Sequence, residues 1–249
     1  MIDQNFIVAG TDTGIGKTTL AALLMLALDG RYWKPVQSGM DGETDSEAVL
    51  RITGLPADRI LPEAYRLTRP LSPDQSARYD GITIDPARLA LPNLSEAPRY
   101  AGGSDAVSGR SIERPSNDLS SDSSFISHPS SLIIESAGGL MVPFNDDLLQ
   151  IDLFPRWGAP VVLAARSVLG TLNHTLLSIE ALRSRAIPLA GIVLIGHEHP
   201  DNMATLERWS DAPIVGTIPY LASITRAALL DVYATRFLPI DAWSLLHER

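Results

Sequence analysis

The stretch VAGTDTGIGKTTL, which begins at Val8, most constrains what this chain can fold into. An apolar run over residues 6–9 predicts a strand, and a helical pattern over residues 18–28 follows it closely. Residues 10–18 between them read GTDTGIGKT. In such a loop the backbone N–H groups and the positive end of the following helix bind phosphate oxygens. We therefore predict that this stretch binds a nucleoside triphosphate.

The end of the loop carries two side chains suited to a triphosphate and its metal ion. Lys17 is expected to reach the β and γ phosphates as a point charge, and the Thr18 hydroxyl to bind Mg²⁺. The spacing departs from the usual P-loop, because the first glycine is Gly10 and Thr11 stands where a glycine is expected. The succession of strand, Gly-Lys-Thr and helix still favours a P-loop over a chance glycine turn.

Further apolar runs alternate with helical patterns along the chain. Strands are predicted over residues 132–134, 161–165, 191–195 and 214–218, and helices over residues 172–185 and 203–209. Continuous apolar strands separated by helices indicate an α/β fold, a three-layer P-loop NTPase fold whose mostly parallel sheet has helices on both faces. Ligands bind beyond the carboxyl ends of such strands. The segments to inspect are therefore 34–39, 135–143, 166–173 and 196–199.

Length and composition restrict the function. We expect a single domain over residues 1–249 with a serine-rich surface insertion at about 93–131, whose composition cannot form a core. The absence of a long apolar run or a basic leader predicts a cytoplasmic protein without a membrane partner. A net charge of −9 disfavours nucleic acid as a partner. The absence of cysteine excludes disulfides, thiolate metal sites and thiol nucleophiles.

Two acidic residues are candidates for completing the metal site. Glu135 ends a predicted strand, where P-loop proteins place a metal-linked acid, although it could instead accept N–H bonds from the glycine turn that follows. Thr44 and Glu47 form a capping box, which puts Asp45 in the first turn of a helix. A carboxylate there either joins the metal site or only complements the helix dipole. The residues alone leave both alternatives open.

A lysine and two histidines are also candidate site residues. Lys34 precedes Pro35 and is either a surface lysine or a positive charge placed where phosphoryl transfer develops negative charge. The spacing does not decide between these roles. His197 and His199 resemble metal ligands, but no third ligand is suggested near them. We therefore do not predict a metal site there.

Taken together and in order, seven motifs resemble those of dethiobiotin synthetases. They are GTDTGIGKT at 10–18, KPVQSG at 34–39, TDSE at 44–47, RPLSPDQSA at 69–77, ESAGGLMVP at 135–143, LGTLNHTLLS at 169–178 and GTIP at 216–219. The resemblance covers nearly all of the chain outside the serine-rich insertion. It implies a homodimeric, Mg²⁺-dependent P-loop ligase of biotin biosynthesis, which closes the ureido ring of dethiobiotin from 7,8-diaminononanoate, CO₂ and ATP.

The resemblance also implies roles for individual residues. Lys34, Lys17 and Thr13 are expected to act in catalysis, and Thr18, Asp45 and Glu135 to hold Mg²⁺. The residues expected to bind the nucleotide are Asp12, Thr13, Gly14, Ile15, Gly16, Lys17, Thr18, Thr19 and Pro219. Those expected to bind the diamine are Thr13, Lys34, Ser38, Gly138, Gly139, Leu169, Gly170, Thr171 and Asn173. The 169–173 loop is expected to reach the substrate carboxylate across the dimer interface.

Three positions depart from the family pattern. Ser136 stands where a glycine usually follows the glutamate, and Asp74 replaces a histidine after Ser-Pro. Ile195 and Gly196 stand where many members carry an Asn-Asp pair that recognises adenine. This last departure leaves the base preference open.

Two other functions are compatible with a P-loop. A nucleotide-switch ATPase of the partition-protein type shares the fold, but that class typically has a second lysine near the start of the loop, and this loop has none. The synthetase-like half of a cobyrinate amidase needs a glutaminase cysteine, which this chain lacks.

Overall fold

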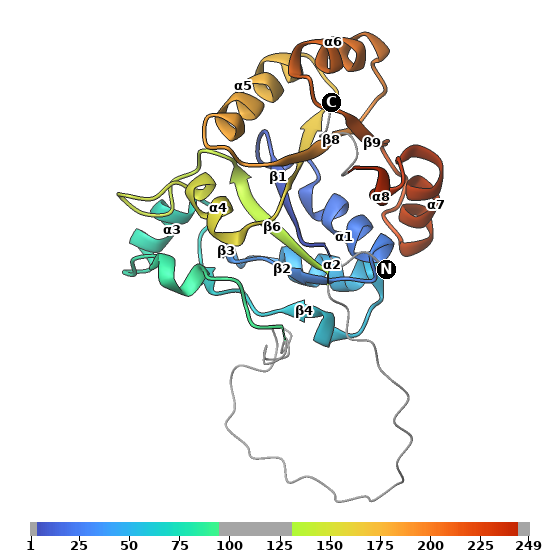
Figure 1. Ribbon diagram of the computed structural model, residues 1–249. Helices are drawn as coiled ribbons and strands as arrows, with labels where there is room; N and C mark the ends of the chain where they lie inside the picture. The colour runs from blue at the N-terminus through green and yellow to red at the C-terminus, as the bar shows by residue number, and fades with distance from the viewer. Residues whose placement is uncertain (1–3, 95–130, 244–249) are drawn as a thin grey trace, which may run out of the picture.

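The computed structural model describes residues 4–94 and 131–243, built around one seven-stranded sheet (Figure 1). The strand order is β4-β2-β6-β1-β7-β8-β9, and every neighbouring pair is parallel. The strands are β1 (Phe6–Gly10), β2 (Arg31–Trp33), β4 (Ile60–Leu61), β6 (Leu132–Gly139), β7 (Val161–Arg166), β8 (Leu189–Ile195) and β9 (Ile214–Ile218). A second sheet pairs β3 (Val36–Ser38) with β5 (Tyr65–Leu67).

Helices cover both faces of the large sheet, and each face has its own apolar core (Figure 1). The helices on one face are α1 (Lys17–Ala27), α2 (Asp45–Thr53), α7 (Arg226–Arg236) and α8 (Ile240–Trp243). Those on the other are α4 (Phe154–Trp157), α5 (Thr171–Arg183) and α6 (Pro200–Ser210). Helix α3 (Pro73–Tyr79) contacts the small sheet. The chain also forms three short 3₁₀ helices in its described part, η1 (Ala57–Arg59), η2 (Pro86–Leu89) and η3 (Gln150–Leu153). The predicted three-layer α/β fold is confirmed.

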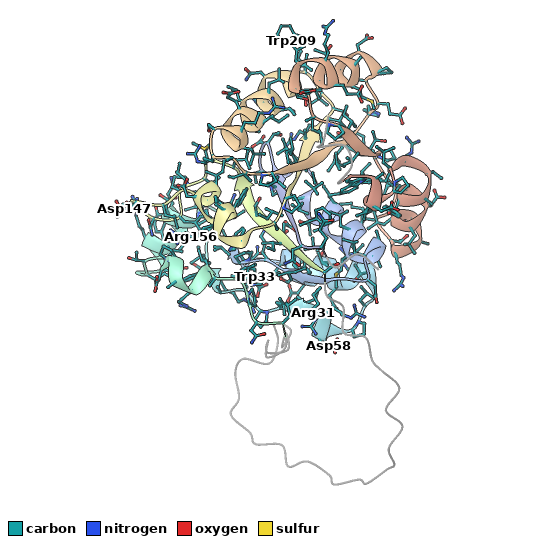
Figure 2. All side chains as sticks on the ribbon, in the orientation of Figure 1. Arg31, Trp33, Asp58, Asp147, Arg156 and Trp209 are labelled. Atoms are coloured by element: carbon teal, nitrogen blue, oxygen red, sulfur yellow. The ribbon has the colours of Figure 1, made fainter. Side chains whose placement is uncertain are left out.

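Aromatic side chains anchor the two cores. The ring of Trp33 packs edge-on against Trp157 on one face of the sheet, and Trp243 packs edge-on against Phe6 on the other. Figure 2 shows Trp209 at the outer end of α6, pointing away from the sheet, with 67% of its surface exposed. Three of the four tryptophans thus stabilise the sheet, whereas the fourth contributes little to either core.

The five predicted strands are present as β1, β6, β7, β8 and β9, and the predicted helices as α1, α5 and α6. Strands β2 and β4 were not predicted, because two or three residues show no periodicity. β2 is a strand because it pairs in register with β6, where Tyr32 lies opposite Ile133. Helix α6 begins at Pro200, ahead of the predicted start, since proline favours the first turn of a helix.

The carboxyl ends of β2, β6 and β1 lie next to one another in the sheet. Lys34 follows β2, and the phosphate loop follows β1. Glu135 was predicted to end its strand but lies within β6, which continues to Gly139 because it pairs with β1 as far as Gly10. Because side chains alternate along a strand, Tyr32, Ile133 and Glu135 share the face covered by α1 and α2. The parallel sheet therefore gathers at one edge residues that are distant in sequence.

Two further expectations concern the serine-rich insertion and membrane-spanning helices. All but the ends of the serine-rich segment 93–131 lies outside the described residues. Among the residues that the structure does describe, none of the helices is long and apolar enough to span a bilayer.

Candidate active site

The phosphate loop joins β1 to α1 and depends on two glycines with positive φ. Gly14 has φ 66° and Gly16 has φ 99°, a region that costs glycine little. A Cβ at Gly16 would also lie 3.2 Å from the Ile195 side chain. No side-chain hydrogen bond caps α1, whose first N–H groups are therefore free to bind an anion. The local geometry is that of a phosphate-binding site.

The unusual position of Gly10 is explained by the way Lys17 folds over the loop. Lys17 Nζ donates a hydrogen bond to the Asp12 carbonyl oxygen over 3.0 Å. A Cβ at Gly10 would lie 2.6 Å from Ile15 Cδ1 and 3.0 Å from both Lys17 Cδ and the Asp12 carbonyl oxygen. A side chain at Gly10 would therefore crowd the Ile15 and Lys17 side chains and the Asp12 backbone. Burial, together with the charge of Lys34, lowers the pKa of Lys17 to about 8.

Three residues from separate parts of the sequence meet beside Thr18. Lys34 Nζ lies 2.8 Å from Asp45 Oδ2 and 2.9 Å from Glu135 Oε1. Thr18 Oγ1 lies 2.8 Å from Asp45 Oδ1 and 3.1 Å from Glu135 Oε1. Lys34 is 4% exposed and Glu135 is 1% exposed, whereas the Asp45 side chain is 32% exposed, so only the Lys34–Glu135 pair is withdrawn from water. The structure thus places Lys34 in the site and not on the surface.

Burial and charge act against each other in this cluster. Burial alone would lower the pKa of Lys34, but Glu135 and Asp45 outweigh it, and the pKa is raised. Burial likewise favours the neutral form of Asp45, yet Lys34 and the Thr18 hydroxyl bring its pKa below the usual range. Burial raises the pKa of Glu135. Lys34 is therefore an ammonium ion held by at least one carboxylate.

Local interactions orient Asp45 at the start of α2. The predicted capping box is present: the Thr44 side chain accepts from the Glu47 N–H, and Glu47 Oε2 accepts from the Thr44 N–H. The backbone N–H of Asp45 donates to Gln37 Oε1 over 3.2 Å. The Asp45 carboxylate therefore projects from a helix end that is held by the capping box and by Gln37.

Two functional neighbours were not found from the sequence. The Tyr32 hydroxyl donates to Glu135 Oε2 over 2.9 Å, and both residues are buried. Arg166, at the end of β7, donates to the Thr13 carbonyl oxygen over 2.8 Å. The only signal for Tyr32 is its position two residues before Lys34, which puts both side chains on one face of the sheet. The signal for Arg166 is its position at the carboxyl end of a predicted strand, where ligands bind in parallel sheets.

A cavity of about 510 Å³ adjoins the phosphate loop and this cluster. The predicted site residues that line it are Thr13, Gly14, Gly16, Lys17, Thr18, Lys34, Ser38, Asp45, Glu135 and Gly138. Part of its wall is apolar and is formed by Val36, Pro70, Leu71, Pro73, Ala137 and Val142. The cavity thus combines a polar, cationic end with aliphatic walls.

The remaining predicted site residues lie outside this lining. These are Asp12, Ile15, Thr19, Gly139, Leu169, Gly170, Thr171, Asn173 and Pro219. The Ile15 side chain is buried in the core, which leaves only its backbone for a nucleotide. Leu169 is fully exposed at the start of α5, and the buried Thr171 hydroxyl pairs with Thr175. The expectation that residues 169–173 bind the substrate of a partner subunit therefore stays a prediction.

Two positions that depart from the family pattern, Ser136 and Asp74, lie in the described part of the chain, and nothing in the structure explains the serine. Ser136 is buried, and its carbonyl accepts a hydrogen bond from Lys34 Nζ over 3.1 Å, while its hydroxyl has no partner in the described part of the chain. Asp74, in the first turn of α3, accepts from the Ser72 hydroxyl, and its N–H donates to the Pro143 carbonyl. Asp74 therefore joins α3 to the segment after β6 and does not line the cavity.

At the end of β8, where the family pattern has an Asn-Asp pair that recognises adenine, this chain has Ile195 and Gly196. The Ile195 side chain packs towards Gly16, and Gly196 has φ 123°. A Cβ at Gly196 would lie 3.0 Å from Ser167 Oγ. The His197 ring packs edge-on against Tyr220, with 4.9 Å between ring centroids. Within residues 4–94 and 131–243, no three His, Cys, Asp or Glu side chains cluster to hold a metal.

The fold and the loop define a P-loop nucleotide-binding protein. The cell division ATPase MinD of Pyrococcus furiosus shares the fold, with a TM-score of 0.50 and 14% identity over 99% of this chain and 98% of that one. A family model described as an AAA domain matches residues 4–101 and 111–228.

Curated relatives narrow this class to one family. The ATP-dependent dethiobiotin synthetase BioD of Rhodopseudomonas palustris strain BisA53 is 46% identical over 93% of this chain and 92% of the relative. The protein of the same name from Agrobacterium fabrum strain C58 is 45% identical over 93% of both chains. The chain belongs to the dethiobiotin synthetase family of ATP-dependent ligases, as its motifs predicted.

Proposed function

We propose that this protein closes the ureido ring of dethiobiotin from 7,8-diaminononanoate, CO₂ and ATP. The observation that carries the proposal is the position of Lys34 Nζ, which lies within 2.9 Å of Asp45 and Glu135 in the cavity shared with the phosphate loop. A carbamate and a γ-phosphate are both anionic, so bringing them together requires fixed cations. Lys17 and Lys34 line the same cavity and supply two.

The reaction has three bond-forming steps. One amine of the diamine attacks CO₂ and loses a proton, which gives a carbamate. A carbamate oxygen then attacks the γ-phosphorus, and the bond to ADP breaks. The second amine attacks the carbonyl carbon of the resulting carbamic-phosphoric anhydride, loses a proton and expels phosphate. No step needs a cysteine or histidine nucleophile, which agrees with a chain that contains no cysteine.

The cavity walls suit these reactants. We infer that Lys17 holds the β and γ phosphates and that Lys34 stabilises the carbamate and the transferred phosphoryl group. Thr13 and Ser38 both line the cavity. The Ser38 hydroxyl has no hydrogen-bond partner among the described residues. The apolar wall that includes Leu71 and Val142 matches the hydrocarbon chain of the diamine.

The donor set beside the loop fits Mg²⁺. Thr18, Asp45 and Glu135 present a hydroxyl and two carboxylates, and the Thr18 oxygen lies within 3.1 Å of both acids. Oxygen atoms are the ligands that Mg²⁺ prefers. The ion, when bound, would neutralise charge on the phosphate oxygens.

A homodimer is the other part of the proposal. Leu169, just before α5, is fully exposed, and Leu177, in the middle of α5, is 61% exposed. Exposed apolar side chains of this kind support protein contacts. We infer that residues 169–173 reach the substrate carboxylate in the partner's cavity.

A product assay tests the function. The purified protein is incubated with diaminononanoate, bicarbonate, Mg²⁺ and ATP, and both phosphate and dethiobiotin are measured. We expect phosphate release to require the diamine and to match dethiobiotin one for one. Phosphate release that is independent of the diamine, with no dethiobiotin formed, would contradict the proposal.

A further inference from the structure

We propose that Gln150 is a positioning residue that holds Lys34 and the Gly138 turn in place, an inference that rests on the proposed function. The Gly138 turn comprises residues 137–142, from the end of β6 onwards. Gln150 is the first residue of η3 and is fully buried. Its Oε1 accepts a hydrogen bond from the Ala137 N–H over 2.5 Å, and its Nε2 donates to the Gly139 carbonyl oxygen over 2.9 Å. Because an N–H only donates and a carbonyl only accepts, these partners fix the orientation of the amide.

The first of these bonds acts on Lys34 through one peptide group. A trans peptide points its N–H and C=O in opposite directions, and the described chain contains no cis peptide. Gln150 holds the N–H of the Ser136–Ala137 peptide, so the Ser136 carbonyl points away from Gln150. That carbonyl accepts a hydrogen bond from Lys34 Nζ over 3.1 Å. Within the described residues, the Ser136 carbonyl is the one uncharged acceptor of the Lys34 ammonium group, and Gln150 therefore orients it.

The second bond acts on the cavity wall. Gly138 lies between the two backbone groups that Gln150 holds, has φ 65° and lines the cavity. A Cβ at Gly138 would lie 3.2 Å from Thr13 Oγ1, so the turn lies against the phosphate loop. The backbone N–H of Gln150 also donates to the Val142 carbonyl oxygen over 2.8 Å. Gln150 thus holds the turn at three points.

Packing alone does not explain a glutamine at this position. The neighbouring residues Ile151, Leu153 and Phe154 are fully buried and apolar. Burying an amide among them is unfavourable unless its hydrogen bonds are made, whereas an apolar side chain of similar volume has no such requirement. The turn that Gln150 holds accounts for the polar residue.

Substitution by methionine tests the role. Gln150→Met keeps the volume but removes both hydrogen bonds. We expect kcat for dethiobiotin formation to fall between about tenfold and a hundredfold, because Lys34 and the turn are displaced. The dissociation constant for ATP should stay unchanged, since the phosphate loop is intact. Hydrogen exchange at the Ala137 amide should become faster.

A glutamic acid at the same position provides a conservative rescue. A protonated Gln150→Glu side chain has a carbonyl acceptor and an O–H donor, and burial favours the protonated form. We expect its kcat to approach that of the wild type at low pH and to fall relative to the wild type as pH rises and the acid ionises. Each kcat is taken per folded molecule, with the folded fraction measured by circular dichroism at each pH, so a loss of stability alone does not produce this difference between the two pH profiles.

Thr53→Val is the matched control, because it removes a buried hydroxyl that donates to the Val49 carbonyl over 2.8 Å at the far end of α2. It should lower stability and leave kcat unchanged. The proposal would be overturned if a folded Gln150→Met protein kept the wild-type kcat. It would also be overturned if the affinity for ATP fell by the same factor as kcat. If the wild type forms no dethiobiotin, the proposed function fails. Exchange at Ala137 and the Lys34 Nζ to Ser136 oxygen distance in a crystal structure of Gln150→Met then test the positioning role independently.

Discussion

Lys34 and Asp45 form an ion pair of 2.8 Å between Nζ and Oδ2, while the other oxygen of the same carboxylate accepts from the Thr18 hydroxyl. Asp45 therefore links the lysine proposed to stabilise the transferred phosphoryl group to the proposed metal site. Lys34 also pairs with Glu135 over 2.9 Å, and both of those side chains are buried. Breaking a buried pair on one side leaves an uncompensated charge and costs several kcal/mol. Variants in this cluster must be tested for stability as well as for turnover.

Lys34→Ala is expected to reduce turnover far more than nucleotide binding. Removing one fixed charge that acts in the transition state costs about a hundredfold or more in kcat. The affinity for ATP, measured by calorimetry, should be largely kept because the phosphate loop is unchanged. The free energy of unfolding should also fall, by about 3 kcal/mol, because Glu135 and Asp45 lose their partner.

Lys17→Ala is expected to weaken both ATP binding and turnover. Lys17 Nζ has only the Asp12 carbonyl as a hydrogen-bond partner within the described residues, so its charge is available to the phosphates. Calorimetry with ATP and a turnover assay measure the two effects. An equal loss of ATP affinity in Lys17→Ala and Lys34→Ala would contradict their separate roles.

Tyr32→Phe is expected to raise the Mg²⁺ concentration needed for half-maximal activity. The phenylalanine ring preserves the packing against β6, but Glu135 Oε2 loses its donor. Loss of a partner that orients a metal ligand typically lowers metal affinity about tenfold or more. A Mg²⁺ titration at saturating ATP measures this, and calorimetric Mg²⁺ binding to the nucleotide complex supplies a readout other than activity.

Tyr65→Phe is the control for the loss of a tyrosine hydroxyl. That hydroxyl accepts from the Asp85 N–H over 2.9 Å, and neither Tyr65 nor Asp85 lines the cavity. Its Mg²⁺ dependence should match the wild type. A Tyr32→Phe protein with unchanged Mg²⁺ affinity would show that the hydroxyl does not orient Glu135 for the ion.

The stability of the ligand-free protein should increase between pH 8 and 9.5 through Lys17. Its pKa is about 8 in the folded chain, against an ordinary value of 10.5, so in this range the unfolded chain binds more protons. The free energy of unfolding therefore rises with pH, by on the order of 2 kcal/mol across this window. Urea denaturation at several pH values, compared with Lys17→Met, isolates the effect. If the free energy of unfolding rose equally steeply with pH in both proteins, Lys17 would not be the cause.

The enzyme should discriminate weakly between nucleotide bases. Ile195 and Gly196 offer no side-chain hydrogen bond to a base, and apolar sites reject polar analogues poorly. We expect kcat/KM for GTP and CTP to lie within about tenfold to a hundredfold of that for ATP. Parallel assays with the three triphosphates measure the ratios, and a preference beyond this range would show that the backbone or another side chain reads the base.

Much of the fold could be predicted because it depends on local patterns. The apolar strands, the glycine loop and the capping box at Thr44 each depend on neighbouring residues, and all are present in the structure. The short strand β2 and the roles of Tyr32 and Gln150 could not be predicted in the same way. Each depends on a partner segment that the sequence does not place nearby.

The sequence by itself determined that strand β1 ends in a loop able to bind phosphate and that Lys17 and Thr18 lie at its end, because backbone geometry and helix initiation are set within a few residues. It left open whether Lys34, Asp45 and Glu135 meet. Only the tertiary structure decided that they do, because Lys34 and Glu135 are 101 residues apart and approach each other through the parallel pairing of β2 with β6. Their charge compensation then makes the burial of Lys34 and Glu135 possible, while Asp45 stays partly exposed.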